Sequence, residues 1–394
     1  MTFYGMKKGK ILLCELLNLI ESRLSTKNLF MLCKQLGLNL RFREVRGEEM
    51  ARLAQLRLSM GTSILLVSVI FAAFLAVIMT LLHLPLIWAL IITVIFILIQ
   101  YLIGPAIVRA ATNLRYLRLG EHPWLESTVK DLAQKSGIPM PKLAIVPDKT
   151  PNAFVFGRTT SDATLAVHEG LLTQLNQDEV RGVLGHELGH IKHRDFLIMT
   201  ALSSLPLLAY LIFRGTFEAA WISGRTSRKK EGGGLAAALF VVAIVSYVVY
   251  IISLLCVMRL SRLREHYADS YSAYVTESPR QLSSALTKIT YGLSLSPKPP
   301  HGARMFYIGD PALAKQECQG LLQRKEEYDL DKDGVLDERE LELAMEKEAK
   351  SRWTSINRLF HTHPPTFQRV LLLREIEKEM ESGRYTTERL YAHV

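Results

Sequence analysis

Long apolar runs alternate with charged segments along this chain of 394 residues. Four runs approach the ~20 helical residues that a bilayer crossing requires. They lie near residues 62–82, 84–103, 197–213 and 235–258. The first two are joined only by the segment 83–85, so we expect a tight hairpin there. The third is short and contains Ser203, Ser204 and Pro206, which leaves a buried core helix as its alternative. The pattern predicts an integral membrane protein with about four transmembrane helices.

Basic residues flank these runs and predict their orientation. An even number of spans places residues 1–60, 104–196 and 259–394 on one side, and arginines and lysines border the runs there. The positive-inside rule makes that side cytoplasmic. We therefore expect a multi-pass protein of the cell (inner) membrane, with both termini and the active site in the cytoplasm. One predicted loop disagrees, since it is also basic and contains Arg214, Arg225, Arg228, Lys229 and Lys230.

Composition narrows the class of function. Hydrophobic residues make up 49% of the chain and the formal net charge is +10. The basic residues are spread out and border apolar runs, which suits an anionic membrane surface and argues against nucleic acid as a partner. The four cysteines, Cys14, Cys33, Cys256 and Cys318, are far apart, so we expect neither a disulfide framework nor a cysteine metal site.

The segment VLGHELGHIKHRD (183–195) contains the H-E-x-x-H pattern of a zinc peptidase. Asn176 followed by Glu179 predicts a capping box that opens a helix before it. On that helix His186 and His190 lie about 40° apart and about 6 Å apart along the axis, so both imidazoles can bind one metal ion. Glu187 lies beside them, where it can take a proton from water.

A zinc site of this kind needs a third protein ligand. His193 is about 10 Å along the axis from His186, and Ile191–Lys192 offers no glycine for a bend, so we expect His193 to be a polar residue at the membrane boundary. A remote carboxylate fits better. Glu265 and Asp269, in SRLREHYAD after the fourth run, are four residues apart and share a helical face. Their alternative is a solvated acidic face.

These motifs together resemble the HtpX-type membrane heat-shock proteases, relatives of the CAAX prenyl proteases. The similar pieces occur in the family's order over roughly residues 60–310 and 355–375. They are PNAFVFG (151–157), HELGHIKHRD (186–195), SRLREHYADSYSA (261–273), ARMFYIGDP (303–311) and LFHTHPPTFQRV (359–370). The resemblance implies a mainly α fold with a small β-sheet (α+β), like that of the gluzincin zinc peptidases.

The resemblance also implies the roles of the site residues. One zinc ion would be held by His186, His190 and Glu265, with Glu187 as general base and Asp269 orienting a ligand histidine. Asn152 and His363 would lie near the scissile carbonyl and stabilise its oxyanion. Their alternatives are a Pro-Asn turn residue and a structural histidine before two prolines. The stretch NAF and the strand around Leu165–Val167 would offer an edge to an extended polypeptide substrate.

A segment between Pro311 and Trp353 departs from that family. It contains DLDKDGVLDERE (329–340), which has the spacing of an EF-hand calcium loop. The predicted ligands are Asp329, Asp331, Asp333, the backbone of Val335, Asp337 and Glu340. An acidic turn between charged helices is the alternative. EF-hands usually work in pairs, so with one loop either calcium binding is weak or the partner is a second copy in a homo-oligomer. Calcium control of the protease is a hypothesis.

We expect seven segments. They are a basic amphipathic N-terminal extension (1–60), a transmembrane hairpin (61–103), a first protease segment with the HELGH helix (104–196), a second transmembrane hairpin (197–258), a second protease segment with the third-ligand helix (259–310), the EF-hand-like insert (311–352) and a C-terminal protease segment with the THPP motif (353–394).

The leading interpretation is a membrane-bound zinc metalloendopeptidase that cleaves membrane or misfolded proteins at the cytoplasmic face, in protein quality control and stress response. A CAAX-type prenyl-protein peptidase is one alternative. A non-catalytic, calcium-responsive membrane scaffold is another, but it predicts loss of Glu187 or Glu265, and both are present. An intramembrane protease of the site-2 type is disfavoured because charged residues such as Asp178 and Lys192 surround the metal helix.

Overall fold

The computed structural model describes most of the chain after the first predicted span begins. The described residues are 62, 65–66, 68–80, 85, 87–226, 232–295, 307–330, 332, 344, 347, 361–385 and 391. The predicted N-terminal extension (1–60) lies outside them. So do all the predicted calcium ligands except Asp329, which follows the short helix α12 (Lys325–Tyr328).

Three described helices are long and apolar enough to cross a membrane. They are α4 (Ile87–Thr112), α8 (Asp195–Thr226) and α9 (Gly232–Thr276). Only 6% of the apolar window in α4 is buried, as expected for side chains that face lipid. The first predicted run is described as a shorter apolar helix, Ser68–Thr80. Three spans are therefore supported, and the fourth remains a prediction.

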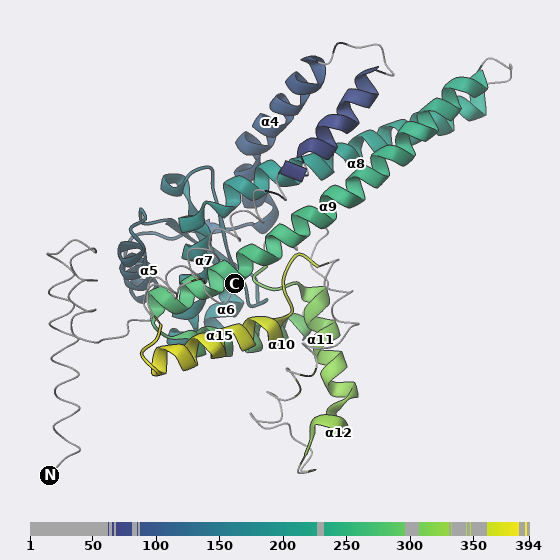
Figure 1. Ribbon diagram of the computed structural model, residues 1–394. Coiled ribbons are helices and arrows are strands. Elements are labelled where there is room, and N and C mark those ends of the chain that lie inside the picture. The colour runs from purple at the N-terminus through teal and green to yellow at the C-terminus, as the bar shows by residue number, and fades with distance from the viewer. Residues whose placement is uncertain are drawn as a thin grey trace, which may run out of the picture. The chain divides into compact units, whose positions relative to one another are not determined.

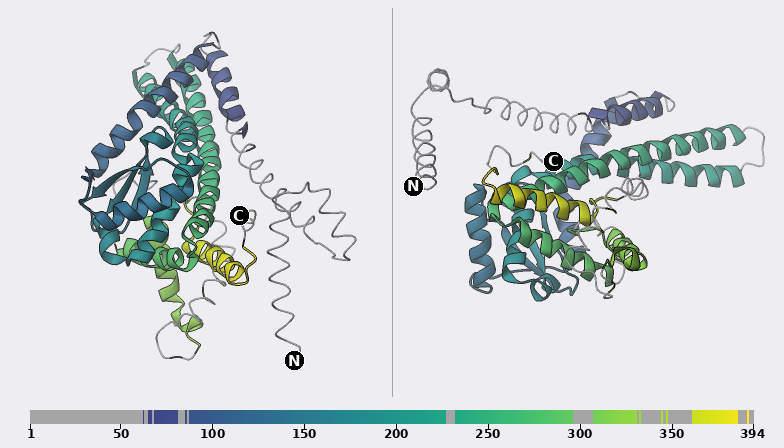
Figure 2. Two further views of the ribbon diagram at one scale, coloured as in Figure 1. Left: turned by 90° about the vertical axis from the view of Figure 1, so that its left-hand side faces the viewer. Right: turned by 60° about the horizontal axis from the view of Figure 1, so that its bottom comes forward.

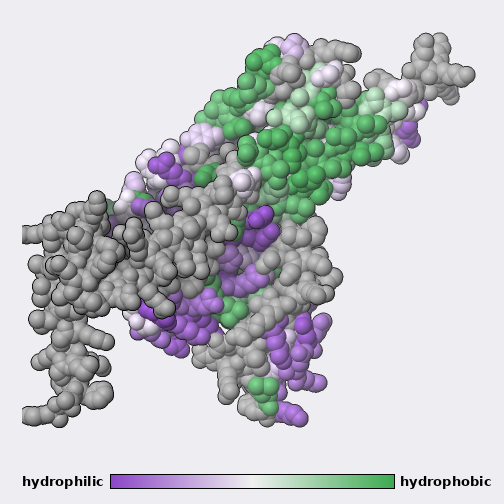
Figure 3. All heavy atoms as spheres, in the orientation of Figure 1, coloured by the Kyte–Doolittle hydropathy of each residue, from purple (hydrophilic) through white to green (hydrophobic). Residues whose placement is uncertain are grey.

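Helices α8 and α9 lie side by side as a long hairpin (Figures 1 and 2). Aromatic rings hold them together, with centroids 5.4 Å apart for Tyr210 and Tyr250 and 5.0 Å apart for Phe213 and Tyr247. Figure 3 shows a broad hydrophobic surface over this hairpin. The shorter apolar helix packs against its base through Phe71, Phe74 and Leu75.

The end of the third apolar run was predicted wrongly. Helix α8 continues past residue 213 as far as Thr226, so Arg214 and Arg225 lie in the helix and not in a loop. Polar residues at helical spacing extend it, since Arg214 Nε donates to Glu218 Oε1 at 3.0 Å, one turn later. The alternative of a short core helix is not supported, because the apolar stretch Leu202–Arg225 is 28% buried in its window.

A four-stranded sheet has the order β1-β2-β4-β3. The strands are β1 (Arg115–Tyr116), β2 (Lys142–Val146), β3 (Ala153–Phe156) and β4 (Thr164–His168). β4 is parallel to β2 and antiparallel to β3. The prediction that Leu165–Val167 offers an edge is therefore wrong, because these residues pair on both sides. The edge strands are β1 and β3, and β3 includes Ala153 and Phe154 of the stretch NAF.

The main core lies between this sheet and the helices of the protease segments. Its fully buried members include Leu132 of α5 (Pro123–Ser136), Leu184 and Leu188 of α7 (Gln177–His193) and Leu282 of α10 (Pro279–Leu295). The remaining helices are α6 (Glu169–Gln174), α11 (Pro311–Gln323) and α15 (Thr366–Glu381), of which α15 packs on α10 and α9. The predicted class, mainly α with a small β-sheet, is confirmed.

Candidate metal centre

Helices α7 and α9 bring three donor groups together. His186 and His190 lie on α7 and Glu265 on α9, and one ligand atom from each lies within 4.8 Å of the others. The two Nε2 atoms are 3.1 Å apart. Glu265 Oε2 is 3.5 Å from His186 Nε2, and Glu265 Oε1 is 3.6 Å from His190 Nε2. The residues that the sequence placed 75 positions apart thus converge on one point.

This cluster fits a zinc ion. Tetrahedral zinc with bonds of about 2.0–2.1 Å holds its ligand atoms about 3.3–3.5 Å apart, close to the distances found here. Glu265 Oε2 is buried and accepts no hydrogen bond from the described residues, and the Nη1 atom of Arg369 lies 3.5 Å from it. A buried carboxylate oxygen that accepts no hydrogen bond is matched by a cation at the centre of the cluster.

The local sequence explains how α7 and α9 approach so closely. The predicted capping box is confirmed. Asn176 Oδ1 accepts a hydrogen bond from Glu179 N at 2.9 Å, and Glu179 Oε2 accepts one from Asn176 N at 3.0 Å. Within the helix, a Cβ atom on Gly185 would lie 2.8 Å from Thr276 Cγ2, and one on Gly189 would lie 3.3 Å from Ala268 Cα. Gly185 precedes HELGH and Gly189 lies within it. Because neither has a side chain, α9 can pack closely against α7 at these two positions.

Asp269 contacts the metal cluster as the resemblance implied. Its Oδ1 atom is 2.9 Å from His186 Nδ1, and both side chains are fully buried. A carboxylate there fixes the ring and leaves Nε2 free to bind a metal. Burial lowers the pKa of His186, but the nearby carboxylates of Asp269 and Glu265 outweigh it and raise that pKa to about 9.

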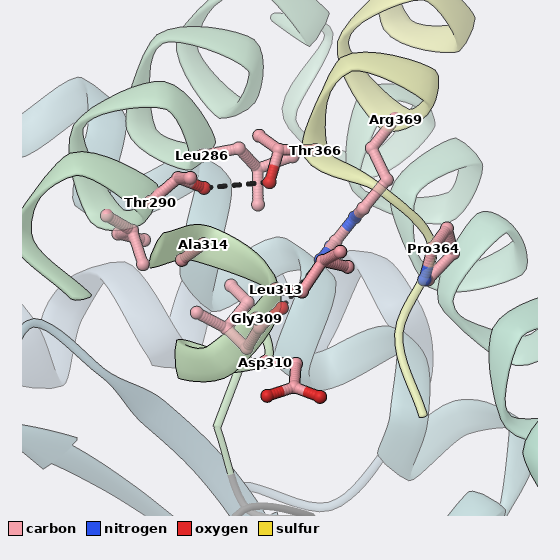
Figure 4. Close-up of a pocket in the computed structure, with 11 residues that line it drawn as sticks. Leu286, Thr290, Gly309, Asp310, Leu313, Ala314, Pro364, Thr366 and Arg369 are labelled. Carbon is pink, nitrogen blue, oxygen red and sulfur yellow. Dashed lines mark hydrogen bonds between the residues drawn. The ribbon is translucent and has the colours of Figure 1, made fainter. Parts of the chain in front are cut away.

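Arg369 is a site residue that the sequence analysis missed. Its Nη2 donates to Asp269 Oδ1 at 2.7 Å and its Nε to Asp269 Oδ2 at 2.8 Å, while Nη1 donates to Ile308 O at 2.6 Å. Figure 4 shows the side chain extending from the start of α15 toward the Gly309 segment. The signal was its place in LFHTHPPTFQRV, but an arginine is rarely expected to be fully buried.

Burial also changes the pKa values of the other titratable side chains around the cluster. Burial raises the pKa of the Glu187 carboxyl and lowers that of His190 to about 4. His363 is also brought to the cluster, with Nε2 3.8 Å from Glu265 Oε1. Burial lowers the pKa of His363 as well, so this imidazole is neutral at physiological pH.

Asn152 makes contacts one step away from the cluster. Its Oδ1 accepts from Ile308 N at 2.9 Å, and its Nδ2 lies 3.4 Å from His168 Nε2. Because Arg369 donates to the carbonyl oxygen of Ile308, a chain of hydrogen bonds leads from Asn152, just before β3, through Ile308 and Arg369 to Asp269.

His193 lies outside the cluster. Its Nε2 is 2.7 Å from Tyr391 Oη, and its ring packs against those of Tyr267 and Tyr271. Helix α7 continues through His193 without a bend, which is why the ring does not turn back to the metal ligands. Three tyrosine rings pack against it, and its place at the membrane boundary stays a prediction.

Comparison with known proteins identifies the family of this chain. The chain matches peptidase family M48 over residues 120–377. It is 39% identical to the "Protease HtpX homolog" of Methanothermobacter thermautotrophicus over 226 residues, covering 57% of this chain and 78% of that protein. It is 35% identical to the "Protease HtpX homolog" of Thermococcus kodakarensis over 284 residues, covering 72% and 83%. The crystal structure of S. mikatae Ste24p aligns with a TM-score of 0.43 at 15% identity, covering 81% of this chain and 67% of that one.

The family match spans well over half of the chain and includes both helices of the metal cluster. The apolar helices α4, α8 and α9 agree with a protein of the membrane. The chain belongs to peptidase family M48 and is an HtpX-type membrane zinc metalloprotease, a hydrolase of peptide bonds.

Proposed function

We propose that His186, His190 and Glu265 hold the catalytic zinc ion and that Glu187 is the general base. The observation that carries this proposal is the convergence of three ligand atoms from α7 and α9 within 4.8 Å. When bound, zinc acts as a Lewis acid on the scissile carbonyl and makes water nucleophilic at neutral pH. Asp269 holds the ring of His186 in the orientation that directs its Nε2 atom into the cluster.

Proton transfer is assigned to Glu187. Its carboxylate takes a proton from the attacking water and later delivers that proton to the leaving amine. Burial raises the pKa of this carboxyl, which strengthens it as a base and makes a protonated state accessible during the reaction.

We assign stabilisation of the oxyanion to His363 and Asn152. His363 is neutral and buried beside Glu265, so its imidazole can donate a hydrogen bond without adding a charge. Asn152 accepts from Ile308 N through Oδ1, so only its Nδ2 group, which also lies 3.4 Å from His168 Nε2, can act as the donor. A test is the replacement of each residue by alanine, with kcat expected to fall more than KM rises.

The substrate is proposed to add to the edge of the sheet. Strand β3 (Ala153–Phe156) pairs with β4 on one side, and no described strand pairs with its other side. An extended polypeptide can continue the ladder there, with its main chain supplying the hydrogen bonds. Such recognition depends little on sequence, which suits misfolded or unneeded membrane proteins as substrates in quality control.

Helix α9 supports a proposal for the position of the site relative to the bilayer. Glu265 is seven residues beyond the predicted end of the apolar run at 258, or about 10 Å along a helix. Cleavage is therefore proposed near the membrane surface. The basic residues that flank the spans support the cytoplasmic face of the cell (inner) membrane as that surface.

The insert (311–352) is proposed to bind calcium through Asp329, Asp331, Asp333, Val335, Asp337 and Glu340. We also propose that the chain is divided into the seven segments predicted from its sequence. Asp310 directly precedes the insert, and its Oδ2 atom lies 3.1 Å from Nδ1 of His361 in the C-terminal protease segment. A calcium-dependent change in the insert would reach His363, two residues after His361. Pairing with the loop of a second copy would make the protein a homo-oligomer.

The decisive experiment compares wild type with Glu187→Gln, both purified in detergent with zinc, on an unfolded protein substrate with and without calcium. Glu187→Gln should retain stoichiometric zinc and lose cleavage by several orders of magnitude. Asp178→Asn, which alters an exposed carboxylate on the same helix, is the matched control. Equal cleavage by wild type and Glu187→Gln would refute the assignment of the base.

A further inference from the structure

The second ligand histidine also has a buried carboxylate partner. His190 Nδ1 lies 2.7 Å from Asp195 Oδ2, and the Asp195 side chain is 7% exposed. The relationship repeats the one between His186 and Asp269, but it comes from a different region of the chain. Neither the H-E-x-x-H pattern nor the resemblance assigned a role to Asp195.

A break in the helix places Asp195 there. In a continuous α-helix, residues five apart lie about 140° from each other around the axis and do not share a face. Helix α7 instead ends at His193, Arg194 follows in the left-handed conformation with φ 59°, and Asp195 begins α8. The turn at Arg194 directs the carboxylate of Asp195 back to the Nδ1 atom of His190.

The other oxygen of Asp195 is also engaged. Asp195 Oδ1 forms an ion pair with Nη2 of Arg264, whose side chain is 5% exposed. Arg264 precedes Glu265 on α9, so the ion pair joins the first residue of α8 to the stretch of α9 that carries a ligand. A buried carboxylate with a cation on one oxygen and an imidazole on the other has one orientation.

We propose that Asp195, held by Arg264, is the positioning residue for His190. This inference rests on the proposed role of His190 as a zinc ligand. A carboxylate at Nδ1 keeps the proton on that nitrogen, so that the lone pair of Nε2 points into the cluster. Because Asp195 begins α8 and Arg264 lies on α9, the ligand geometry also depends on the closure of the transmembrane hairpin at its base.

The test measures zinc affinity of the full-length protein in detergent by competition with a chelator. Asp195→Ala should bind zinc about 10–100-fold more weakly than wild type, the usual effect of removing such a partner. The zinc affinity of Asp195→Asn should lie between those of wild type and Asp195→Ala, because its amide oxygen still accepts a hydrogen bond from His190 Nδ1 but carries no charge. Arg264→Ala should weaken binding in the same direction, because it releases the carboxylate of Asp195.

Matched controls are Asp178→Asn on α7 and Arg259→Ala on α9, both exposed and expected to bind zinc like wild type. The visible spectrum of the cobalt-substituted protein adds a signature of ligand geometry that a general loss of stability would not change. If Asp195→Ala does not fold, the near-isosteric Asp195→Asn and the Arg264→Lys variant carry the test.

The outcomes separate the two proposals. Zinc affinity and cobalt spectrum like those of Asp178→Asn in all Asp195 and Arg264 variants would overturn the positioning role. Failure of wild type to bind zinc, or unchanged affinity in His190→Ala, would instead overturn the proposed metal site itself.

Discussion

Arg369 donates to both carboxylate oxygens of Asp269, at 2.8 Å from Nε and 2.7 Å from Nη2. The pair joins α15, near the C-terminus, to the helix that carries Glu265. Both side chains are almost completely buried, so neither charge has water as a substitute partner.

Arg369→Ala is therefore expected to destabilise the fold by about 3–5 kcal/mol, the usual effect of leaving one member of a buried ion pair unpaired. Urea unfolding in detergent measures the change. Lys378→Ala, an exposed cation on the same helix, should change stability by about 0.5 kcal/mol or less. An equally small effect of Arg369→Ala would contradict the structural role of the pair.

Zinc binding should depend on pH through His186. The pKa of His186 is raised to about 9, so below pH 9 this imidazole is protonated in zinc-free protein, and zinc must displace the proton. Apparent affinity should rise with pH by about tenfold per unit between pH 6 and 8 from this group. Calorimetry in buffers of different ionisation enthalpy should detect about one proton released per zinc bound. Release of no proton would contradict the prediction.

The same histidine gives the zinc-free protein a pH-dependent stability. Since the folded pKa lies above the unfolded value, the contribution is fully present below about pH 6.5 and is lost as the pH rises through about 9. Thermal unfolding of zinc-free protein across pH 6–10 measures it. Asp269→Asn should flatten the dependence, because it removes the carboxylate that raises the pKa.

Gly185→Ala is expected to force α7 and α9 apart. The added methyl would lie 2.8 Å from Thr276 Cγ2 and 2.9 Å from Ser272 Oγ. Overpacking of this kind costs about 1–3 kcal/mol, and a shift of α9 would also weaken zinc binding through Glu265. Gly215→Ala in α8 is the control, because its methyl would meet nothing within 4 Å. It should be neutral or slightly stabilising, and equal effects of the two substitutions would argue against close approach at Gly185.

Calcium binding by the insert has a matched control within the same loop. Glu340→Gln removes the carboxylate expected at position 12 and should lower calcium affinity by at least about tenfold in a calorimetric titration. Glu338→Gln changes the same residue type at a position that is not a ligand, and should bind calcium as wild type does. Calcium affinity that is the same in both variants would reject the EF-hand.

The sequence predicted those features of the site that depend on local spacing. The helix of His186 and His190, its capping box, and the shared face of Glu265 and Asp269 all follow from helical geometry, and α7 and α9 present them as expected. The family resemblance was what linked the two helices, since spacing along one helix says nothing about which other helix lies beside it.

Two residues near the ligand histidines, Asp195 and Arg369, could not be predicted from helical spacing. The contact of Asp195 with His190 depends on the left-handed conformation of Arg194, and the sequence there has no glycine or proline that would predict a turn. Arg369 reaches Asp269 only because α15 packs on α9, a contact between residues 100 positions apart. The prediction of an edge at Leu165–Val167 was wrong for a similar reason. The apolar sequence of Thr164–His168 does not show whether the strand lies at an edge of the sheet or between two other strands.

Helix α9 runs unbroken for 45 residues, about 68 Å, from the far end of the hairpin to a point beyond Glu265. Its membrane span and its ligand carboxylate therefore belong to one rigid rod. A single residue inserted between the apolar run and Glu265 would turn the lipid-facing side by about 100° relative to that carboxylate. Packing against α8, which sets the tilt of such a rod, thus bears directly on the direction from which Glu265 meets the histidines.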